Sequence, residues 1–246
     1  MENEKKIALL IDADNVSQKY IKYILDELAT YGISTYKRIY GDWTQPNLSS
    51  WKEQLLECSI TPVQQYSYTK GKNSTDSALI IDAMDILYSK NVDGFCIVSS
   101  DSDFTRLAAR LREAGMLVIG MGEEKTPRPF ITACERFKYL ESLCPMEEQE
   151  PQNEGKKKRN NSKEIQKLIK TIRSIVNEVS DEEGWAYLGD VGNVLNKRLP
   201  DFDTRNYGFH KLMPLVQSLK VFEVRSFQRE GMEFQKFIRN KQGGKK

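Results

Sequence analysis

Three short acidic segments hold the side chains best suited to chemistry in this chain. The first is Ile-Asp-Ala-Asp-Asn at 11–15, the second is Lys-Asn-Ser-Thr-Asp at 72–76, and the third is Ser-Ser-Asp-Ser-Asp-Phe at 99–104. Carboxylates held close together repel one another, and a divalent cation placed between them offsets that repulsion. These residue types therefore indicate a metal site, and its candidate ligands are Asp12, Asp76, Asp101 and Asp103.

The kind of metal follows from the ligand atoms that the segments offer. Ligand sets made only of oxygen favour Mg²⁺ or Mn²⁺ over zinc, and such ions lower the pKa of a bound water and stabilise charge on a phosphate. The one histidine, His210, and four cysteines without a Cys-x-x-Cys pair support neither a zinc site nor a disulfide framework. We expect the chemistry to rest on carboxylates, with Lys70 and Lys72 placed to neutralise a phosphate beside Asp76.

Alternating apolar runs and helical patterns in the first half must position these segments. Ile7–Asp12 has the composition of a strand buried on both faces. Further strands are predicted at Ser34–Tyr40, Ile60–Gln65, Phe95–Ser99 and Met116–Met121. Helical spacing of apolar residues lies between them, around 16–31, 51–56, 75–87 and 104–111. This order implies an α/β fold, a Rossmann-like parallel sheet with helices on both faces.

The predicted sheet brings the acidic segments to one edge. In open parallel sheets, ligand sites lie beyond the carboxyl ends of the strands, where the strand order reverses. We expect the first and fourth strands to be neighbours there, so that Asp12 and Asp101 face one crevice and Asp76 and Asp103 close the ring. Each segment alone also fits a helix cap or a turn, and it is their combination at strand ends that favours a metal site.

Several polar and aromatic residues near these segments are predicted to have structural roles only. Asp85 is expected on a solvated helix face, and so is Asp82, although Asp82 stays open because it shares the helix of Asp76. Tyr40, Trp43 and Trp51 are expected to pack in the core or at the rim, where the Tyr40–Trp43 run after a strand end is a candidate rim contact.

The second half has a different composition and predicts a separate domain. Residues 146–162 are polar and lack apolar periodicity, which predicts a flexible linker containing the Lys156–Arg159 run. Helical patterns around 165–176, 188–199 and 207–219, followed by strands at 221–226 and 233–238, predict a small winged-helix α+β module. The expected division is a domain at 1–145, the linker at 146–162, a domain at 163–240 and a disordered tail at 241–246.

Charge divides between the two halves. Residues 1–150 hold 17 Lys and Arg against 23 Asp and Glu, a net −6, whereas residues 151–246 hold 20 against 12, a net +8. This asymmetry predicts an acidic site in one half and binding of an anionic partner by the other. No apolar run approaches the ~20 residues of a membrane span, and the five residues Ile7–Ile11 are too few for a signal-peptide core. We expect a cytoplasmic protein with no membrane partner.

The three acidic segments resemble the NYN domain, a branch of the PIN-like nucleases. Ile-Asp-Ala-Asp-Asn, Thr-Asp-Ser-Ala-Leu-Ile-Ile-Asp and Val-Ser-Ser-Asp-Ser-Asp-Phe carry the resemblance, which covers roughly residues 5–143. It implies a Rossmann-like sheet and divalent-metal-dependent cleavage of RNA. By position, it implies metal-binding roles for Asp12, Asp76, Asp101 and Asp103, and a polar site role for Asn15.

The second half resembles the LOTUS domain, also called OST-HTH. The matching residues are Trp-Ala-Tyr-Leu-Gly-Asp-Val-Gly at 185–192, Pro-Asp-Phe-Asp at 200–203 and Arg-Asn-Tyr-Gly-Phe at 205–209, within about 163–238. The resemblance implies a winged helix-turn-helix that binds RNA or, in some members, a protein partner. Trp185, Tyr207 and Phe209 are expected in the core. The candidates for RNA contact are the basic residues Lys197, Arg198, Arg205, Lys211 and Lys220.

Three functions compete for this sequence. The leading one is hydrolysis of an RNA phosphodiester by a metal-activated water. A phosphatase of the haloacid dehalogenase type is suggested by Asp12-x-Asp14, and Val16 agrees with its pattern, but the Thr-Asp and Ser-Asp-Ser-Asp-Phe segments fit the nuclease better. The non-enzymatic alternative is an RNA-binding adaptor whose acidic site holds a metal without catalysing a reaction. The sequence does not indicate the oligomeric state.

Overall fold

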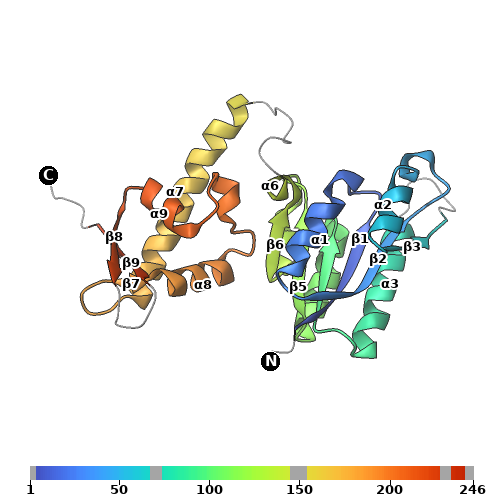
Figure 1. Cartoon of the computed structure of the whole chain (residues 1–246), viewed down its shortest axis with the longest axis horizontal. Coiled ribbons are helices and arrows are strands. Elements are labelled where there is room, and N and C mark those ends of the chain that lie inside the picture. Colours follow the sequence, from blue (N-terminus) through green and yellow to red (C-terminus); the bar gives the residue numbers. More distant parts are fainter. Residues whose placement is uncertain (1–3, 67–73, 145–153, 228–233, 242–246) are drawn as a thin grey trace. The chain divides into compact units, whose positions relative to one another are not determined.

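The structure is a computed structural model that describes residues 4–66, 74–144, 154–227 and 234–241. Its contacts divide the chain into two compact units, Met1–Glu148 and Gln149–Lys246. Each unit has its own hydrophobic core. Figure 1 shows the helices and strands of both units. The finer domain and linker boundaries expected from the sequence stay a prediction.

The first unit is built on a parallel sheet in the order β3-β2-β1-β4-β5-β6. Its strands are β1 Lys6–Asp12, β2 Ile33–Gly41, β3 Thr61–Gln64, β4 Gly94–Val98, β5 Leu117–Gly122 and β6 Arg136–Tyr139. The central strand β1 pairs with β2 on one side and β4 on the other, so Ile11 lies opposite both Ile39 and Val98. The strand order reverses between β1 and β4, which confirms that these two strands are neighbours at the switch point.

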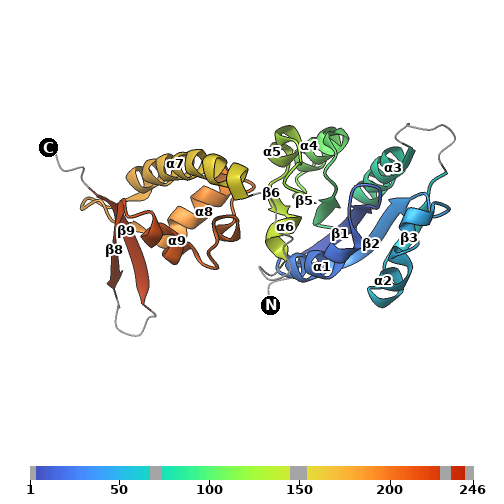
Figure 2. The same cartoon turned by 90° about the horizontal axis from the view of Figure 1, so that it is seen from above.

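Helices cover both faces of this sheet (Figure 2). One face is covered by α1 Ile21–Ala29, α2 Trp51–Glu57 and α6 Leu140–Leu143, and the other by α3 Ser74–Ser89, α4 Thr105–Glu113 and α5 Arg128–Ala133. Successive residues of a strand point to opposite faces. The core on the first face accordingly takes Ile7, Leu9 and Ile11 of β1, while the core on the second face takes Ala8 and Leu10.

The second unit combines three helices with a small antiparallel sheet in its described part. Its helices are α7 Glu154–Val179, α8 Leu188–Arg198 and α9 Leu212–Ser218, and its strands are β7 Ala186–Tyr187, β8 Phe222–Phe227 and β9 Gln235–Asn240, in the order β7-β9-β8. Leu168, Ile172, Val191, Leu195 and Val216 are buried in the core. Helices with an antiparallel hairpin confirm the α+β class expected for this half.

The structure differs from the sequence predictions at five helices and strands. α7 begins at Glu154, well before its apolar stripe at Ile165, so residues 154–162, which were expected in the flexible linker, are helical. Lys and Arg favour helices without needing a buried face, so the polar composition concealed this start. The short elements β6, α5, α6 and β7 were not predicted. The expected tail lies outside the described residues except for Lys241, whose N–H donates to the Val221 carbonyl.

No helix in the described part of the chain combines the length and the apolar character that crossing a membrane requires.

Candidate metal centre

Asp12 is the last residue of β1 and is almost completely buried, with 1% of its surface exposed. Its Oδ1 accepts a hydrogen bond from the Asp14 N–H at 3.1 Å. Its Oδ2 accepts from Asn15 Nδ2 at 2.8 Å and from Ser99 Oγ at 2.7 Å. Burial raises the pKa of the Asp12 carboxyl, and the hydrogen bonds from Ser99, Asn15 and Asp14 partly offset this rise. Asn15 therefore orients Asp12 from the adjacent turn.

Ser99 connects Asp12 to the loop that follows β4. While donating to Asp12, its hydroxyl oxygen also accepts a hydrogen bond from the Asp101 N–H at 3.0 Å. The end of β5 approaches this point closely, since a Cβ at Gly122 would lie 2.5 Å from the Ser99 carbonyl oxygen. Sequence reasoning included Ser99 in a motif but gave it no role. The only available signal was its place at the end of a buried strand, directly before the acidic turn.

Asp101 and Asp103 are placed by the short 3₁₀ turn Ser102–Phe104 after β4. Asp101 is the N-cap of this turn, and its Oδ1 accepts from the Asp103 N–H at 2.9 Å. The turn is anchored by Phe104, which is fully buried in the core that α4 covers. Capping thus fixes the Asp101 side chain and brings Asp103 to the same side of the loop.

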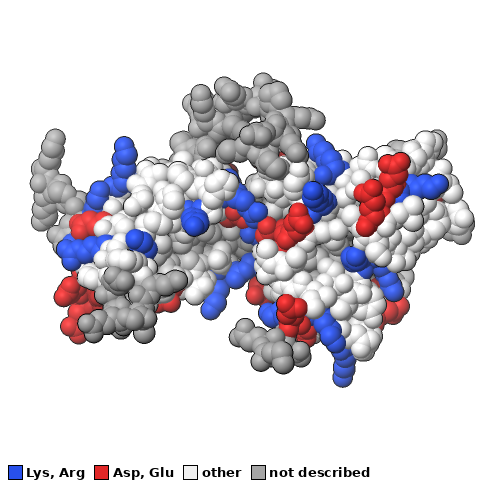
Figure 3. Space-filling view, in the orientation of Figure 1, with Lys and Arg blue, Asp and Glu red and all other residues white. Residues whose placement is uncertain are grey.

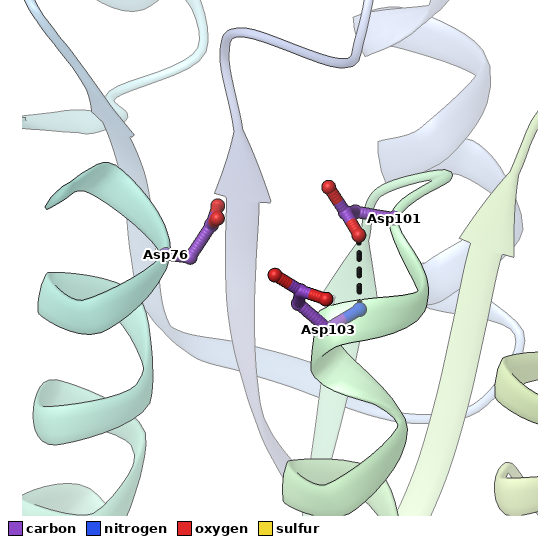
Figure 4. Close-up of side chains that lie close together, drawn as sticks. All are labelled: Asp76, Asp101 and Asp103. Atoms are coloured by element: carbon purple, nitrogen blue, oxygen red, sulfur yellow. Dashed lines mark hydrogen bonds between the residues drawn. The ribbon is translucent and has the colours of Figure 1, made fainter. Parts of the chain in front are cut away.

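Asp76 approaches these two carboxylates from the first turn of α3 (Figure 4). Asp76, Asp101 and Asp103 each offer one oxygen such that all three oxygens lie within 4.8 Å of one another. The pKa of Asp76 is raised to about 6, first by burial and then by the negative charges of Asp12, Asp101, Asp103 and Asp14, in that order. Asp12 is outside this group of three carboxylates, but among the acidic neighbours its charge raises the pKa of Asp76 most.

The donor set fits a hard divalent cation. Oxygens that bind one Mg²⁺ at about 2.1 Å lie within about 4.2 Å of one another, close to the 4.8 Å limit of this cluster. Within the described residues, neither Asp76 nor Asp101 forms an ion pair with Lys or Arg. Asp76, Asp101 and Asp103 are thus the described carboxylates whose oxygens are close enough to hold one Mg²⁺ or Mn²⁺ together, and the expected role of Asp12 as a further ligand stays a prediction.

Asp82 lies on the same helix as Asp76 but has a different role. Its carboxylate forms an ion pair with Arg38 and accepts a hydrogen bond from the Tyr40 hydroxyl, both on β2. Burial and this carboxylate raise the pKa of Tyr40 well above its usual range. Asp82, which the sequence left open, is therefore not merely solvated, because β2 presents the Arg38 cation and the Tyr40 phenol to this turn of α3. Asp85 is exposed, as expected.

The loop after β2 is held by Asp42. This carboxylate accepts hydrogen bonds from Thr44, from Gln45 Nε2 at 3.1 Å and from Gln64 Nε2 at 2.9 Å. These bonds hold the pKa of Asp42 well below its usual range. Trp43 donates its indole N–H to the Val63 carbonyl at 3.1 Å, so it packs at the rim as expected. Because both of its carboxylate oxygens accept hydrogen bonds, Asp42 stabilises the loop after β2 and is not a candidate metal ligand.

The basic residues predicted to contact RNA are in different situations. Lys70 and Lys72 lie outside the described residues. Arg198 is paired with Glu178, and Arg205 with Asp203 at 2.7 Å, so these two guanidinium groups already have partners. Lys197, Lys211 and Lys220 are exposed. Tyr207 and Phe209 pack partly buried against the second unit's core, and Trp185 is 4% exposed.

A parallel α/β sheet with an acidic cluster at its switch point defines a Rossmann-like domain of the PIN-like type, followed here by a small α+β module. The NYN domain family matches residues 6–141, and the chain belongs to that family. The OST-HTH/LOTUS domain matches residues 158–233. Both resemblances drawn from the sequence are thereby confirmed, and they indicate a nuclease type of domain followed by an RNA-binding type of domain.

Individual relatives add little about activity. An uncharacterised protein of Methanocaldococcus jannaschii is 27% identical over 128 residues, which make up 50% of each chain. The chain thus spans about half the length of this curated relative. A protein of unknown function from Vibrio parahaemolyticus has a solved structure that is 20% identical and covers 56% of this chain and 93% of its own, with a TM-score of 0.46. An uncharacterised protein from Nitrosomonas europaea is 37% identical, covering 31% of this chain and 75% of its own, with a TM-score of 0.29.

Proposed function

We propose that this protein is a divalent-metal-dependent ribonuclease that hydrolyses RNA phosphodiester bonds and binds RNA with its second unit. The observation that supports this most is the cluster of Asp76, Asp101 and Asp103 at the switch point of an NYN domain, with oxygens within 4.8 Å of one another. Carboxylates brought this close repel one another, a divalent cation between them would offset that repulsion, and Mg²⁺ or Mn²⁺ suits an all-oxygen site.

The chain's own residues supply the geometry of the reaction. A divalent cation, when bound, provides a water of lowered pKa and stabilises the charge that develops on the phosphate. Asp76, Asp101 and Asp103 would hold that cation. Asp12 and Asn15 support them through Ser99, whose hydroxyl joins the end of β1 to the Asp101 loop. Partners of this kind orient the ligands and typically change metal affinity or activity by roughly 10–100-fold.

The haloacid dehalogenase alternative is disfavoured by the position of Asp12. That reaction requires the first aspartate to attack a phosphate and form an aspartyl phosphate. Here Asp12 is 1% exposed, and both of its oxygens accept hydrogen bonds from Asp14, Asn15 and Ser99. A carboxylate held in this way supports neighbouring groups and is poorly placed as a nucleophile.

The deciding experiment incubates the purified full chain with labelled single-stranded RNA and Mg²⁺ or Mn²⁺. We expect cleavage by the wild type, none in EDTA, and a loss exceeding roughly 100-fold for Asp101→Asn. Asp85→Asn is the matched control, because Asp85 is an exposed carboxylate on the helix that carries Asp76. Equal cleavage by both variants would contradict this site. RNA binding without cleavage in either metal would instead identify the non-catalytic adaptor.

A further inference from the structure

The small sheet of the second unit has one buried face and one outward face. Strand pairing places Val224 opposite Ile238, which is fully buried in the core. Because neighbouring residues of a strand point to opposite faces, Phe237 lies on the outward face. It pairs directly with Arg225 on β8 and with Tyr187 on β7.

Three aromatic rings contact one another on this outward face. The ring of Phe237 lies 5.7 Å from that of Tyr187 and 5.4 Å from that of Phe227, between centroids. Tyr187 is 39% exposed and Phe227 is 46% exposed. Contiguous exposed apolar surface on a soluble domain marks an interaction site. We call Tyr187, Phe227 and Phe237 the aromatic face.

Cations border the aromatic face. The guanidinium groups of Arg225 and Arg239 each lie 4.6 Å from the ring centre of Trp185, and Arg239 is also paired with Glu223 at 2.6 Å. Trp185 and Arg225 line a pocket of about 420 Å³. Its other lining residues include Lys220 and Lys241. The indole N–H of Trp185 is buried and lacks an acceptor among the described residues.

We propose that the aromatic face and the adjoining pocket bind single-stranded RNA, with bases stacked on Tyr187, Phe227 and Phe237. Phosphates would contact Arg225, Lys220 and Lys241. The proposal rests on the RNA binding proposed above and names the surface responsible. Aromatic rings stack on unpaired bases of any type, which favours single strands over duplexes.

Charge favours RNA over an apolar protein segment as the occupant. Around the face, Glu223 is paired with Arg239. The charges of Arg225, Lys220 and Lys241 have no carboxylate partner among the described residues, although the Lys241 ammonium donates a hydrogen bond to the Lys220 carbonyl at 2.9 Å. Net charge alone would not have located this surface, because acidic and basic side chains are mixed over the face of the molecule seen in Figure 3. Arg198 and Arg205, two of the contacts predicted from sequence, are already paired with carboxylates.

The test measures equilibrium binding of a labelled single-stranded RNA of about 12 nucleotides, a length within the usual site sizes for such surfaces. The full chain carries Asp101→Asn and is kept in EDTA, so that cleavage cannot interfere. We expect Phe227→Ala to weaken binding roughly tenfold with an unchanged salt dependence, and Phe227→Tyr to restore it. Arg225→Gln should weaken binding and reduce the slope of log affinity against log salt by about 1.

Tyr88→Ala is the matched control, because Tyr88 is a 68% exposed aromatic residue on α3 of the first unit. Thermal unfolding verifies that each variant folds. The proposal is overturned if Phe227→Ala and Arg225→Gln bind RNA as the parent does. Weak binding by Lys197→Gln or Lys211→Gln would then place the RNA surface at those lysines. If the parent chain itself binds no RNA, the RNA-binding part of the proposed function fails as well, and the two failures are therefore distinguishable.

Discussion

Replacing Asp76 with asparagine should stabilise the metal-free protein at neutral pH. The pKa of this carboxyl rises from 3.8 to about 6 in the folded chain, through burial and through the charges of Asp12, Asp101 and Asp103. In a dry site such a rise would correspond to about 3 kcal/mol against the ionised form. Asp76 is only partly buried, so solvent screening reduces the effect, and we expect about 1 kcal/mol.

The direction of the pH dependence follows from the raised pKa. Well below pH 3.8, Asp76 is protonated in both the folded and the unfolded chain, so it contributes no penalty. As the pH rises from about 4 through about 6, the unfolded chain ionises this carboxyl more easily than the folded chain, and stability is lost. Asp76→Asn removes this loss. Its advantage over the wild type should therefore be small near pH 4 and complete above about pH 6.5.

The assay is thermal unfolding in EDTA across this pH range, read by circular dichroism. A difference of about 1 kcal/mol should raise the Tm of the variant by roughly 2–4 °C at pH 7. Asp85→Asn, an exposed carboxylate on the same helix, should leave the Tm unchanged. Adding Mn²⁺ should then stabilise the wild type more than Asp76→Asn. A variant that is less stable than the wild type at pH 7, or equally stabilised at pH 4 and pH 7, would refute the reasoning.

Three further outcomes are expected. EDTA should stop RNA cleavage and Mg²⁺ or Mn²⁺ should restore it; tight, stoichiometric zinc that activity requires would contradict an all-oxygen site. Ser99→Ala should reduce cleavage by roughly 10–100-fold at limiting Mn²⁺, and less at saturating metal, because Ser99 orients Asp12 and the Asp101 loop. A chain ending at Pro145 should still cleave short RNA at saturating substrate, with weaker binding and a shallower salt dependence; unchanged binding would exclude the second unit as the RNA anchor.

The sheet of the first unit could be predicted because its strands β1, β4 and β5 are buried on both faces. Such strands are continuous apolar runs, as in Ile7–Ile11. In the segments between them, the apolar residues recur at the spacing of a helix. The edge strand β6 could not be found in this way. Its sequence, Arg-Phe-Lys-Tyr, buries only Phe137, and its pairing with β5 depends on contacts distant in sequence. The two-residue strand β7 is recognisable only from its pairing with β9.

The candidate site could be located from the sequence, but the separate roles of its carboxylates could not. Strand ends and helix starts predicted that Asp12, Asp76, Asp101 and Asp103 would converge. The motifs do not distinguish a buried aspartate that accepts three hydrogen bonds from an aspartate that offers an oxygen to the cluster. That distinction depends on Ser99, which donates a hydrogen bond to Asp12, 87 residues away in the chain, and accepts one from the Asp101 N–H in its own loop.

The hydrogen-bond and ion-pair partners of each carboxylate, more than the sequence motif around it, decide which aspartates of the first unit remain available to a cation. Asp42 is held by Thr44, Gln45 and Gln64, and Asp82 by Arg38 and Tyr40. These contacts satisfy both carboxylates within the protein. Asp76 is the opposite case, because burial and neighbouring negative charges make its ionised form unfavourable in the metal-free chain. A bound cation would relieve that unfavourable charge, so the same repulsion that weakens the fold without metal strengthens metal binding at Asp76, Asp101 and Asp103.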